Sequence, residues 1–228
     1  MNFSSFRSSA AAMRSRKGFD GTFVTFDHET GEWRAGINRT GITGRQLVAA
    51  VYDLFVVWQR FFAGDRKFHY ASAGFVRDGH QPPARDRLPD RNPDHWEKPD
   101  RDPWQLVWYL ALFDQETREQ FLYSSGSDGG RQTLAALQEA FADHNEGRGS
   151  LEWPIVELSS DSYVNKKTGI KVYKPLLEIL NWVTPPAAFR RPKLPEADIK
   201  IYFDVPEVDE LDFAGVPEGY PDFDPEEV

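Results

Sequence analysis

The sequence lacks cysteine altogether and holds only two methionines among its 228 residues. Without cysteine the chain has no disulfide bonds, no thiolate zinc site and no thiol nucleophile. Long hydrophobic runs are missing as well. The nearest candidate, Leu47 to Trp58, is shorter than the roughly 18 apolar residues of a membrane span, and Asp53 interrupts it. We therefore expect a cytoplasmic protein that does not insert into membranes and that folds on its hydrophobic core alone.

The N-terminal end of the chain lacks acidic residues, and the C-terminal end lacks basic residues. The whole sequence has 36 acidic and 27 basic residues, but the stretch from Val205 to Val228 holds nine acidic residues and no basic one. The formal net charge of −9 therefore lies entirely in this tail. Residues 1–18 carry four cations and no acid, which is typical of a disordered basic arm, with a transit peptide as the alternative. This composition predicts a basic arm at 1–18, a single globular domain at 19–204 and a flexible acidic tail at 205–228.

Hydrophobic periodicity and turn signals predict an α+β fold in which strands outnumber helices. Two main helices are expected. Between Gly44 and Phe62 the polar residues Gln46, Asp53 and Arg60 recur every seven positions, which predicts a mostly buried helix with a narrow polar stripe. The segment Arg131 to His144 has the amphipathic pattern of the second helix.

Strands are expected on either side of these helices, joined mostly by hairpin turns. No β-α-β series is present, so we expect a mainly antiparallel and strongly curved sheet. A barrel like that of the oligonucleotide-binding fold is one form that such a sheet takes. The expected strands lie in a hairpin at 23–33 and at 67–76, 104–113, 118–124, 151–158, 170–173, 176–183 and 199–203.

A long loop is expected at residues 77–103, where proline, arginine and aspartate are frequent and aliphatic residues are rare. Loops of this length inside a compact domain are usually functional or disordered. Its arginines together with Trp96 suit the clamping of an unpaired nucleic-acid strand. The alternating Arg and Asp equally suit a solvated surface whose charges pair with one another.

A lysine-rich hairpin at residues 163–174 is the strongest candidate for a binding site. It holds four lysines and two tyrosines, and no acidic residue follows Asp161 within it. Cations at a hairpin tip suit phosphate groups, and aromatic side chains offer faces on which bases stack. The alternative is an edge hairpin that its lysines keep soluble.

The glycine-rich segment from Ser124 to Arg131 lies between an expected strand and an expected helix. Backbone amides at the start of that helix, aided by Arg131, suit a bound anion. No Gly-Lys-Ser/Thr sequence follows, so it is not a Walker loop. The alternative is a flexible turn in which Ser127 or Asp128 caps the helix.

Signatures of catalysis do not stand out in the sequence. The five histidines show no metal-binding spacing, and no Gly-x-Ser-x-Gly motif is present. No pair of carboxylates has the apolar surroundings that would suit acid–base chemistry. We therefore predict neither catalytic residues, nor a metal, nor a cofactor. A divalent-metal nuclease built from scattered carboxylates remains as a third hypothesis.

The acidic tail and the hairpin at 163–174 resemble the organisation of single-stranded DNA-binding proteins, including those of bacteriophages. The resemblance implies a β-rich body of the oligonucleotide-binding barrel type that binds single-stranded nucleic acid with little sequence preference, in replication or recombination. The implied tail competes with nucleic acid and recruits replication or recombination proteins. The predicted nucleic-acid contacts are Lys166, Lys167, Lys171, Lys174, Tyr163, Tyr173, Arg131 and Trp96. The predicted partner-binding residues of the tail are Asp212, Phe213, Tyr220, Asp222, Phe223 and Asp224.

A second hypothesis is a protein-interaction module. In this case the protein is a phage accessory protein or inhibitor whose acidic tail mimics nucleic acid and captures a basic partner. The exposed strand edges of small barrels often pair, so a homo-oligomer is compatible with either hypothesis.

Overall fold

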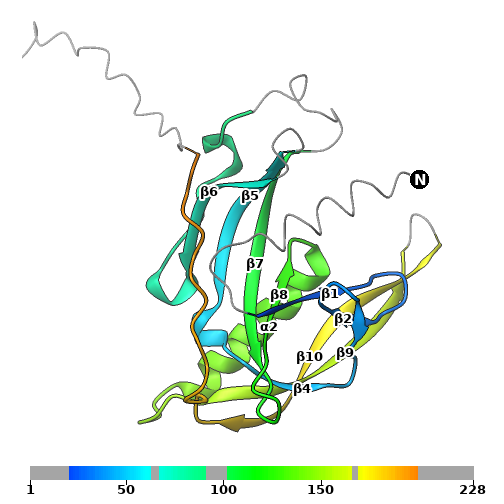
Figure 1. Ribbon diagram of the computed structural model, residues 1–228, viewed down its shortest axis with the longest axis vertical. Helices are drawn as coiled ribbons and strands as arrows, with labels where there is room; N and C mark the ends of the chain where they lie inside the picture. The colour runs from blue at the N-terminus through cyan, green and yellow to red at the C-terminus, as the bar shows by residue number, and fades with distance from the viewer. Residues whose placement is uncertain (1–20, 63–66, 91–101, 166–168, 200–228) are drawn as a thin grey trace, which may run out of the picture.

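The computed structural model describes residues 21–62, 67–90, 102–165 and 169–199. These residues form a curled sheet, shaped like a half-barrel, with one α-helix packed against it (Figure 1). The helix is α2 (Asp128–Asn145). Three short 3-10 helices, η1 (Val51–Asp53), η2 (Val76–Asp78) and η3 (Arg85–Arg87), lie in the connections. The strands are β1 (Thr22–Phe26), β2 (Trp33–Ala35), β3 (Thr40–Gly41), β4 (Gln46–Ala49), β5 (Phe55–Phe62), β6 (Lys67–Phe75), β7 (Trp104–Phe113), β8 (Gln120–Ser125), β9 (Trp153–Val164) and β10 (Lys171–Val183).

The strand order of the sheet is β10-β9-β4-β7-β8-β1-β2-β3. The long strand β7 is the centre, because β4 pairs with its last residues and β5 pairs with its first half, while β8 lies along its other edge. Strand β6 pairs with β5. The pairs are antiparallel, as expected, except that β1 runs parallel to β8, so the sheet is mixed.

Strand β7 shows why the sequence forms a sheet that is buried on both sides. Its alternate residues Leu110 and Leu112 face α2, while Tyr109 and Ala111 face the opposite side, and all four are buried. Side chains alternate between the two faces of a strand, so a run that is apolar at every position suits a strand covered on both faces. Two hydrophobic cores result, one on each side of β7.

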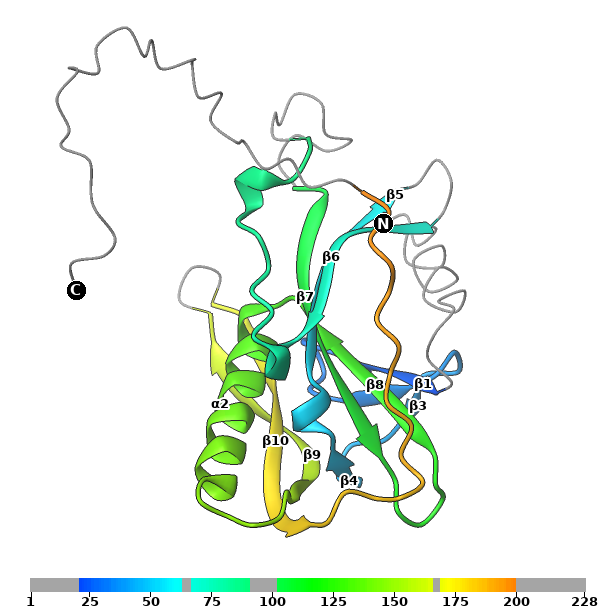
Figure 2. The same cartoon turned by 90° about the vertical axis from the view of Figure 1, so that its left-hand side faces the viewer.

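The first core lies between the sheet and α2. Leu134 and Leu137 of the helix pack there against residues of β4, β7, β8, β9 and β10. The second core lies on the outer face of β7 and is partly covered by Phe189 and Leu194. These two residues belong to the segment 184–199, which we call the strap (Figure 2). The strap runs past the outer face and ends beside β6, where the amides of Asp198 and Ile199 donate to the carbonyl of Tyr70.

The helix predicted for residues 44–62 is wrong, so the described part of the chain has one α-helix instead of two. The segment forms β4, η1 and β5. Val56 and Val57 are both buried although they point to opposite faces, which a one-sided helix does not allow. The seven-residue spacing of polar residues arises for unrelated reasons: Gln46 is exposed, whereas Asp53 is buried in an ion pair with Arg77.

The second predicted helix and most predicted strands agree closely with the structure. Helix α2 begins where Ser127 accepts a hydrogen bond from the amide of Gly130, as the helix-cap alternative predicts. The long loop is only partly solvated, because Leu88 is fully buried against Trp58 and Trp104. The remainder of that loop, residues 91–101, and residues 200–203 of the predicted last strand lie outside the described residues.

Candidate nucleic-acid interface

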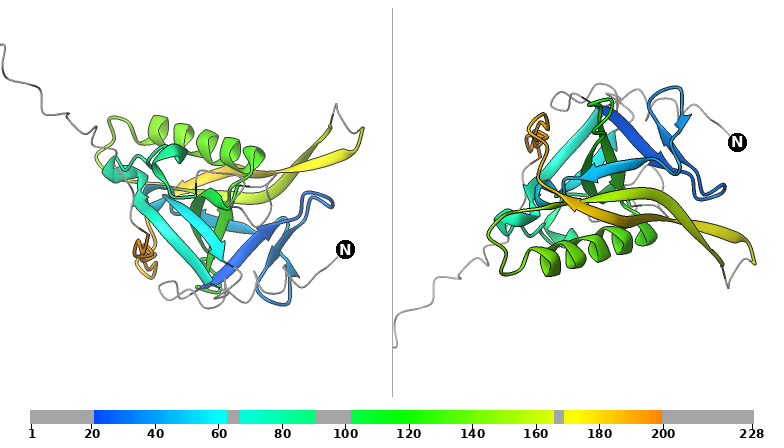
Figure 3. Two further views of the ribbon diagram at one scale, coloured as in Figure 1. Left: turned by 90° about the horizontal axis from the view of Figure 1, so that it is seen from above. Right: turned by 90° about the horizontal axis from the view of Figure 1, so that it is seen from below.

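The lysine-rich hairpin is the projecting end of the β9–β10 ribbon, and we call its residues 159–174 the arm. Figure 3 shows the arm extending beyond both α2 and the β1–β2 hairpin. Three large apolar side chains near its tip are mostly exposed: Tyr163 at 53%, Val164 at 62% and Ile170 at 63%. Lys166 and Lys167 lie outside the described residues.

The predicted contact residues of the arm divide between its two faces. Val172 lies opposite Tyr163, and Lys174 lies opposite Asp161. Directly opposed residues of an antiparallel pair share a face, so Tyr163 and Lys174 lie on one face of the arm. Lys171 and Tyr173 alternate with them and lie on the other. The structure therefore brings together Lys171 with Tyr173, but not Tyr163 with Tyr173.

On the face of Tyr173, the tyrosine ring joins the arm to the body. The Tyr173 amide donates to the carbonyl of His28 over 2.9 Å, and a Cβ at Gly31 would come within 2.6 Å of the tyrosine ring. The ammonium of Lys171 lies 4.8 Å from the centre of the ring, a cation–π distance. Tyr173 thus closes the half-barrel against the β1–β2 turn, and Lys171 remains the outward cation of this face.

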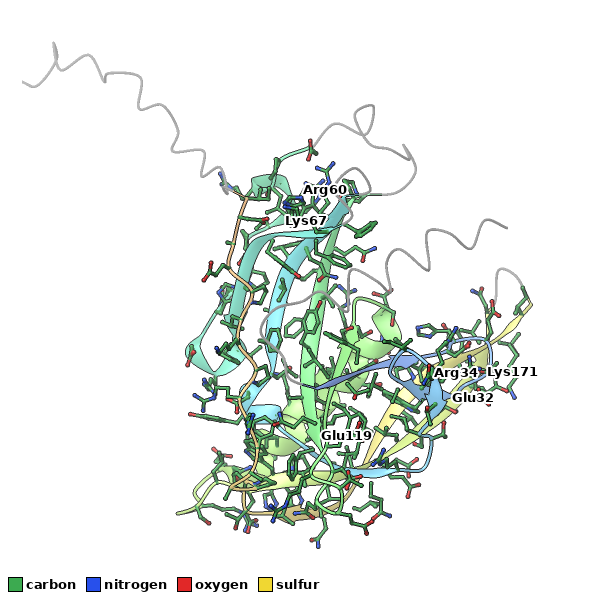
Figure 4. The ribbon with its side chains drawn as sticks, in the orientation of Figure 1. Glu32, Arg34, Arg60, Lys67, Glu119 and Lys171 are labelled. Atoms are coloured by element: carbon green, nitrogen blue, oxygen red, sulfur yellow. The ribbon has the colours of Figure 1, made fainter. Side chains whose placement is uncertain are left out.

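Beside Lys171, the β1–β2 hairpin presents charges that pair with one another (Figure 4). Arg34 binds Glu32 over 2.6 Å and approaches Asp27 to 3.5 Å. Burial raises the pKa of Asp27, but hydrogen bonds from the amides of Glu29 and Thr30 and the nearby arginines outweigh it and leave the pKa lowered. This hairpin therefore adds little net charge to the face.

On the opposite face of the arm, the cations are neutralised locally. The ammonium of Lys174 lies 3.1 Å from a carboxylate oxygen of Asp161, and its hydrogen bond is the main cause of the lowered pKa of Asp161. The predicted contact Arg131 pairs with Asp128 in the first turn of α2. The exposed ring of Tyr163 is the feature of this face that suits stacking.

The glycine-rich segment before α2 has a structural explanation. A Cβ at Gly130 would lie 1.9 Å from the Ser125 hydroxyl, so only glycine fits where the helix meets β8. Tyr123 packs beside it, and burial raises the pKa of Tyr123 to about 12. Gly130 therefore serves close packing of the helix on the sheet, and the anion site remains a prediction.

Arginines of the β5–β6 end and of the loop that follows are paired with aspartates. Arg60 pairs with Asp90, and Arg85 binds Asp102 over 2.6 Å. Figure 4 shows Arg60 and Lys67 side by side at this end of the molecule. The alternation of Arg and Asp is thus largely a set of internal ion pairs. Trp96, which was predicted to stack on bases, lies outside the described residues.

Three cations of the outer face were not identified from the sequence. Arg118, Arg190 and Lys193 are exposed, and among the described residues no carboxylate lies within ion-pair distance of them. The signal was the Arg-Arg-Pro-Lys run of the strap, residues 190–193. The predicted tail residues, Asp212 to Asp224, lie outside the described part of the chain.

Two further searches of the described residues were negative. No group of three or more histidine, aspartate or glutamate side chains in this part of the chain is arranged to hold a metal ion. No helix there is both long and apolar enough to cross a membrane.

Comparison with known proteins identifies no relative. No protein-family model, no curated protein and no solved structure matches the chain.

Proposed function

We propose that the protein binds single-stranded nucleic acid with little sequence preference, without catalysing a reaction on it, and serves replication or recombination. The observation that carries the proposal is the strand order β10-β9-β4-β7-β8, with α2 between β8 and β9. The oligonucleotide-binding fold is a five-stranded, partly open Greek-key barrel. Its first strand lies between the second and the fourth, and its helix connects the third strand to the fourth. Strands β4, β7, β8, β9 and β10 fit these five positions in order.

The match to the strand order of the oligonucleotide-binding fold also suggests a role for the long loop at residues 77–103 and for the arm. In that fold, ligands contact the face of strands two and three and the loops that join strands one to two and four to five. The equivalents here are the outer face of β7 and β8, the long connection from β4 to β7, which holds β5, β6 and residues 76–103, and the tip of the arm. The composition of the sequence independently predicts that the long loop and the arm are candidate binding sites.

Lys171 and Tyr163 are the described arm residues that suit contact with a nucleic acid. Lys171 has no carboxylate within ion-pair distance among the described residues, and Tyr163 is 53% exposed. Stacking of one base on an aromatic ring contributes about 1–3 kcal/mol and tolerates any base. Because the two side chains lie on opposite faces of the arm, the nucleic acid contacts the arm around its edge rather than on one flat side.

The acidic tail can compete for the same surface. Residues 200–228 follow the strap, whose end lies on the opposite side of the molecule from the arm (Figure 1). A chain of this length reaches up to roughly 100 Å when extended, which is ample for a path around a domain of this size. The tail would then leave the cations when nucleic acid binds, and its aromatic residues would be free to engage a partner protein.

The proposal is tested by fluorescence anisotropy of a labelled thymidine oligonucleotide, titrated with the full-length protein at several salt concentrations. Binding should weaken steeply with salt, with a log–log slope of about −0.7 per phosphate contacted. Lys171→Ala should reduce the slope by about 0.7, whereas Arg148→Ala, which removes an exposed and carboxylate-paired cation, should not.

Tyr163 gives a second test that involves no change of charge. Tyr163→Ala should weaken binding about tenfold, while Tyr163→Phe keeps the ring and should bind like the wild type. If the full-length protein does not bind the oligonucleotide in low salt, the proposed function is wrong.

The exposed apolar tip of the arm favours one alternative, a protein-interaction module. Tyr163, Val164 and Ile170 are each more than half exposed near the tip of the arm, where a partner protein would cover them. This function predicts that the oligonucleotide does not bind at any salt concentration, and that a basic partner protein is captured through the acidic tail and the arm.

A further inference from the structure

The strap covers the face on which an oligonucleotide-binding barrel would hold its ligand. Phe189 packs edge-on against Trp153 with ring centres 4.8 Å apart, and Leu194 contacts the same core on the outer side of β7. Gln120 of β8 exchanges two hydrogen bonds with the backbone of Arg190, over 2.8 and 2.9 Å. A ligand that approaches this face therefore meets the outward surface of the strap.

The strap is held in place along its length. Arg191 binds the buried carboxylate of Asp53 over 2.8 Å, and the next residue, Pro192, is buried. At the far end, His69 lies 2.9 Å from a carboxylate oxygen of Asp198. Four prolines in residues 185–195 restrict the backbone further. The side chains that point outward from the strap are thus presented from a fixed backbone.

The exposed side chains of the strap include the cations Arg190 and Lys193, and further along the acidic residue Glu196. Nearly every other described arginine has a carboxylate partner, but Arg190 and Lys193 have none within ion-pair distance in the described ranges. Arg118, at the adjoining β7–β8 turn, also has no carboxylate within ion-pair distance among the described residues. Its neighbour Glu119 is engaged elsewhere, because it accepts from the Thr22 hydroxyl over 3.0 Å and lies 3.8 Å from Arg45 (Figure 4).

A hollow of about 460 Å³ lies between the β7–β8 turn and the strap. Its size is that of a small-ligand site. It combines a guanidinium, a side-chain amide and small apolar side chains, which suit the polar edge of a nucleobase attached to a phosphate, whereas Phe113 is only 3% exposed and offers no free face for stacking. The lining residues are Phe113, Gln115, Arg118, Pro186, Ala187 and Ala188.

We infer that Arg190, Lys193 and Arg118 bind the phosphates of a single-stranded nucleic acid and that the hollow beside Arg118 accepts one of its bases. The inference rests on the proposed function and extends it to a second site, distinct from the arm. The barrel face is reached through the strap, which supplies the cations that the underlying apolar strands β7 and β8 lack. Because the backbone of the strap is already fixed, binding loses little chain entropy.

The test compares two double variants of the full-length protein that change the net charge equally. Arg190→Ala/Lys193→Ala removes two cations that have no carboxylate partner among the described residues, while Arg39→Ala/Arg148→Ala removes two exposed cations that have one. In anisotropy titrations with a thymidine oligonucleotide, the strap variant should lose about tenfold in affinity at low salt and about 1.4 in the log–log salt slope. The control variant should keep the wild-type slope.

A third variant, Ala188→Leu, tests the hollow without a change of charge. Ala188 is exposed, so the larger side chain narrows the hollow without disturbing a core, and binding should weaken several-fold. Circular dichroism melts of all variants establish that each is folded.

The outcomes separate this inference from the proposed function. If the wild type binds and the strap variant keeps its affinity and slope, the strap site is wrong while the function stands. If the wild type does not bind the oligonucleotide, both are wrong. If the strap variant binds more tightly, as removal of residues 205–228 is expected to do, the cations hold the acidic tail instead, and the inference is overturned.

Discussion

Arg191, in the strap, reaches the buried carboxylate of Asp53 in η1 with an N–O distance of 2.8 Å. The Asp53 side chain is only 3% exposed, and Arg77 binds the same carboxylate oxygen. Arg77 in turn lies 4.4 Å from the ring of Phe75 and 4.9 Å from the ring of Tyr52. One carboxylate thus ties the strap and the end of β6 to the junction between β4 and β5.

Loss of Arg77 should be costly because it leaves Asp53 buried with only one cation. We expect Arg77→Met to lower the free energy of unfolding by about 3 kcal/mol, within the range for a broken buried ion pair. Arg148→Met, at an exposed pair, should change it by less than about 0.5 kcal/mol. Urea unfolding followed by tryptophan fluorescence measures both, and equal effects would contradict the central role of Asp53.

Arg191→Met should act locally rather than globally, because Asp53 keeps Arg77. Amides of the strap, such as that of Arg190, should exchange with deuterium at least tenfold faster, while amides of β7 should keep their protection. Hydrogen-exchange mass spectrometry separates these peptides. Uniform loss of protection throughout the protein would show that the strap is not an independently released segment.

Gly31 and Tyr173 make a reciprocal contact that a double variant can test. Gly31 has a φ of +74°, and an added Cβ would lie 2.6 Å from the Tyr173 ring. We expect Gly31→Ala to cost about 2–4 kcal/mol, from left-handed backbone strain and overpacking together. In the Gly31→Ala/Tyr173→Ala variant the clash with the tyrosine ring should vanish, while the closer approach to the Ser160 hydroxyl at 2.9 Å remains, so the two costs should add only in part. Thermal melts of the wild type, the two single variants and the double variant measure how far the two changes in unfolding free energy depart from additivity.

Tyr123 should make the protein less stable in alkali. Burial raises its pKa to about 12, while an unfolded chain titrates near 10, so the folded state holds the proton more tightly. Its contribution is complete below about pH 10 and is lost as the pH rises through about 12, by up to roughly 3 kcal/mol. The unfolding free energy of Tyr123→Phe should fall less over this window than that of the wild type. Parallel pH dependences would contradict the buried assignment.

Asp114 predicts the opposite behaviour in acid. Burial raises its pKa, but hydrogen bonds from the amides of Thr117 and Glu116 and from Arg45 outweigh it, so the pKa is lowered. Its contribution is complete above the unfolded value, near 4, and is lost as the pH falls through the folded value. Asp114→Asn should cost about 2 kcal/mol at neutral pH, and this difference should shrink on acidification. Asp143→Asn, at an exposed position, is the control.

Features that depend on contacts between neighbours in the chain could be predicted from the sequence, whereas features that depend on distant contacts could not. The turn at residues 114–117 and the cap of α2 by Ser127 depend on neighbours in the chain, and both were predicted. The segment 44–62 was assigned to a helix because a continuous apolar run looks alike in a buried helix and in a strand covered on both faces. Its clustered valines and phenylalanines are typical of strands, in agreement with the structure.

In the candidate site, too, the sequence does not reveal which residues meet across long distances in the chain. The sequence marked the lysines of the arm, but it could not show that Lys174 meets Asp161, or that Tyr163 and Tyr173 face opposite ways. Arg190 and Lys193 were overlooked because the sequence does not reveal which arginines find a carboxylate elsewhere in the fold. An excess of cations on one surface depends on these long-range pairings, so composition alone does not locate it.

The acidic tail gives the last prediction, which separates competition from recruitment. Removal of residues 205–228 eliminates nine carboxylates, the whole formal charge of −9, and takes away none of the described residues. If the tail occupies the cations of the body, its removal should tighten oligonucleotide binding at low salt by about tenfold and have little effect at high salt, where screening already weakens the tail. A variant with Phe213, Tyr220 and Phe223 changed to Ala keeps the charge, so it should bind the oligonucleotide like the wild type and lose only the partner protein. Unchanged or weaker binding after removal of the tail would contradict the competition, because a released cationic surface cannot attract phosphate less than an occupied one.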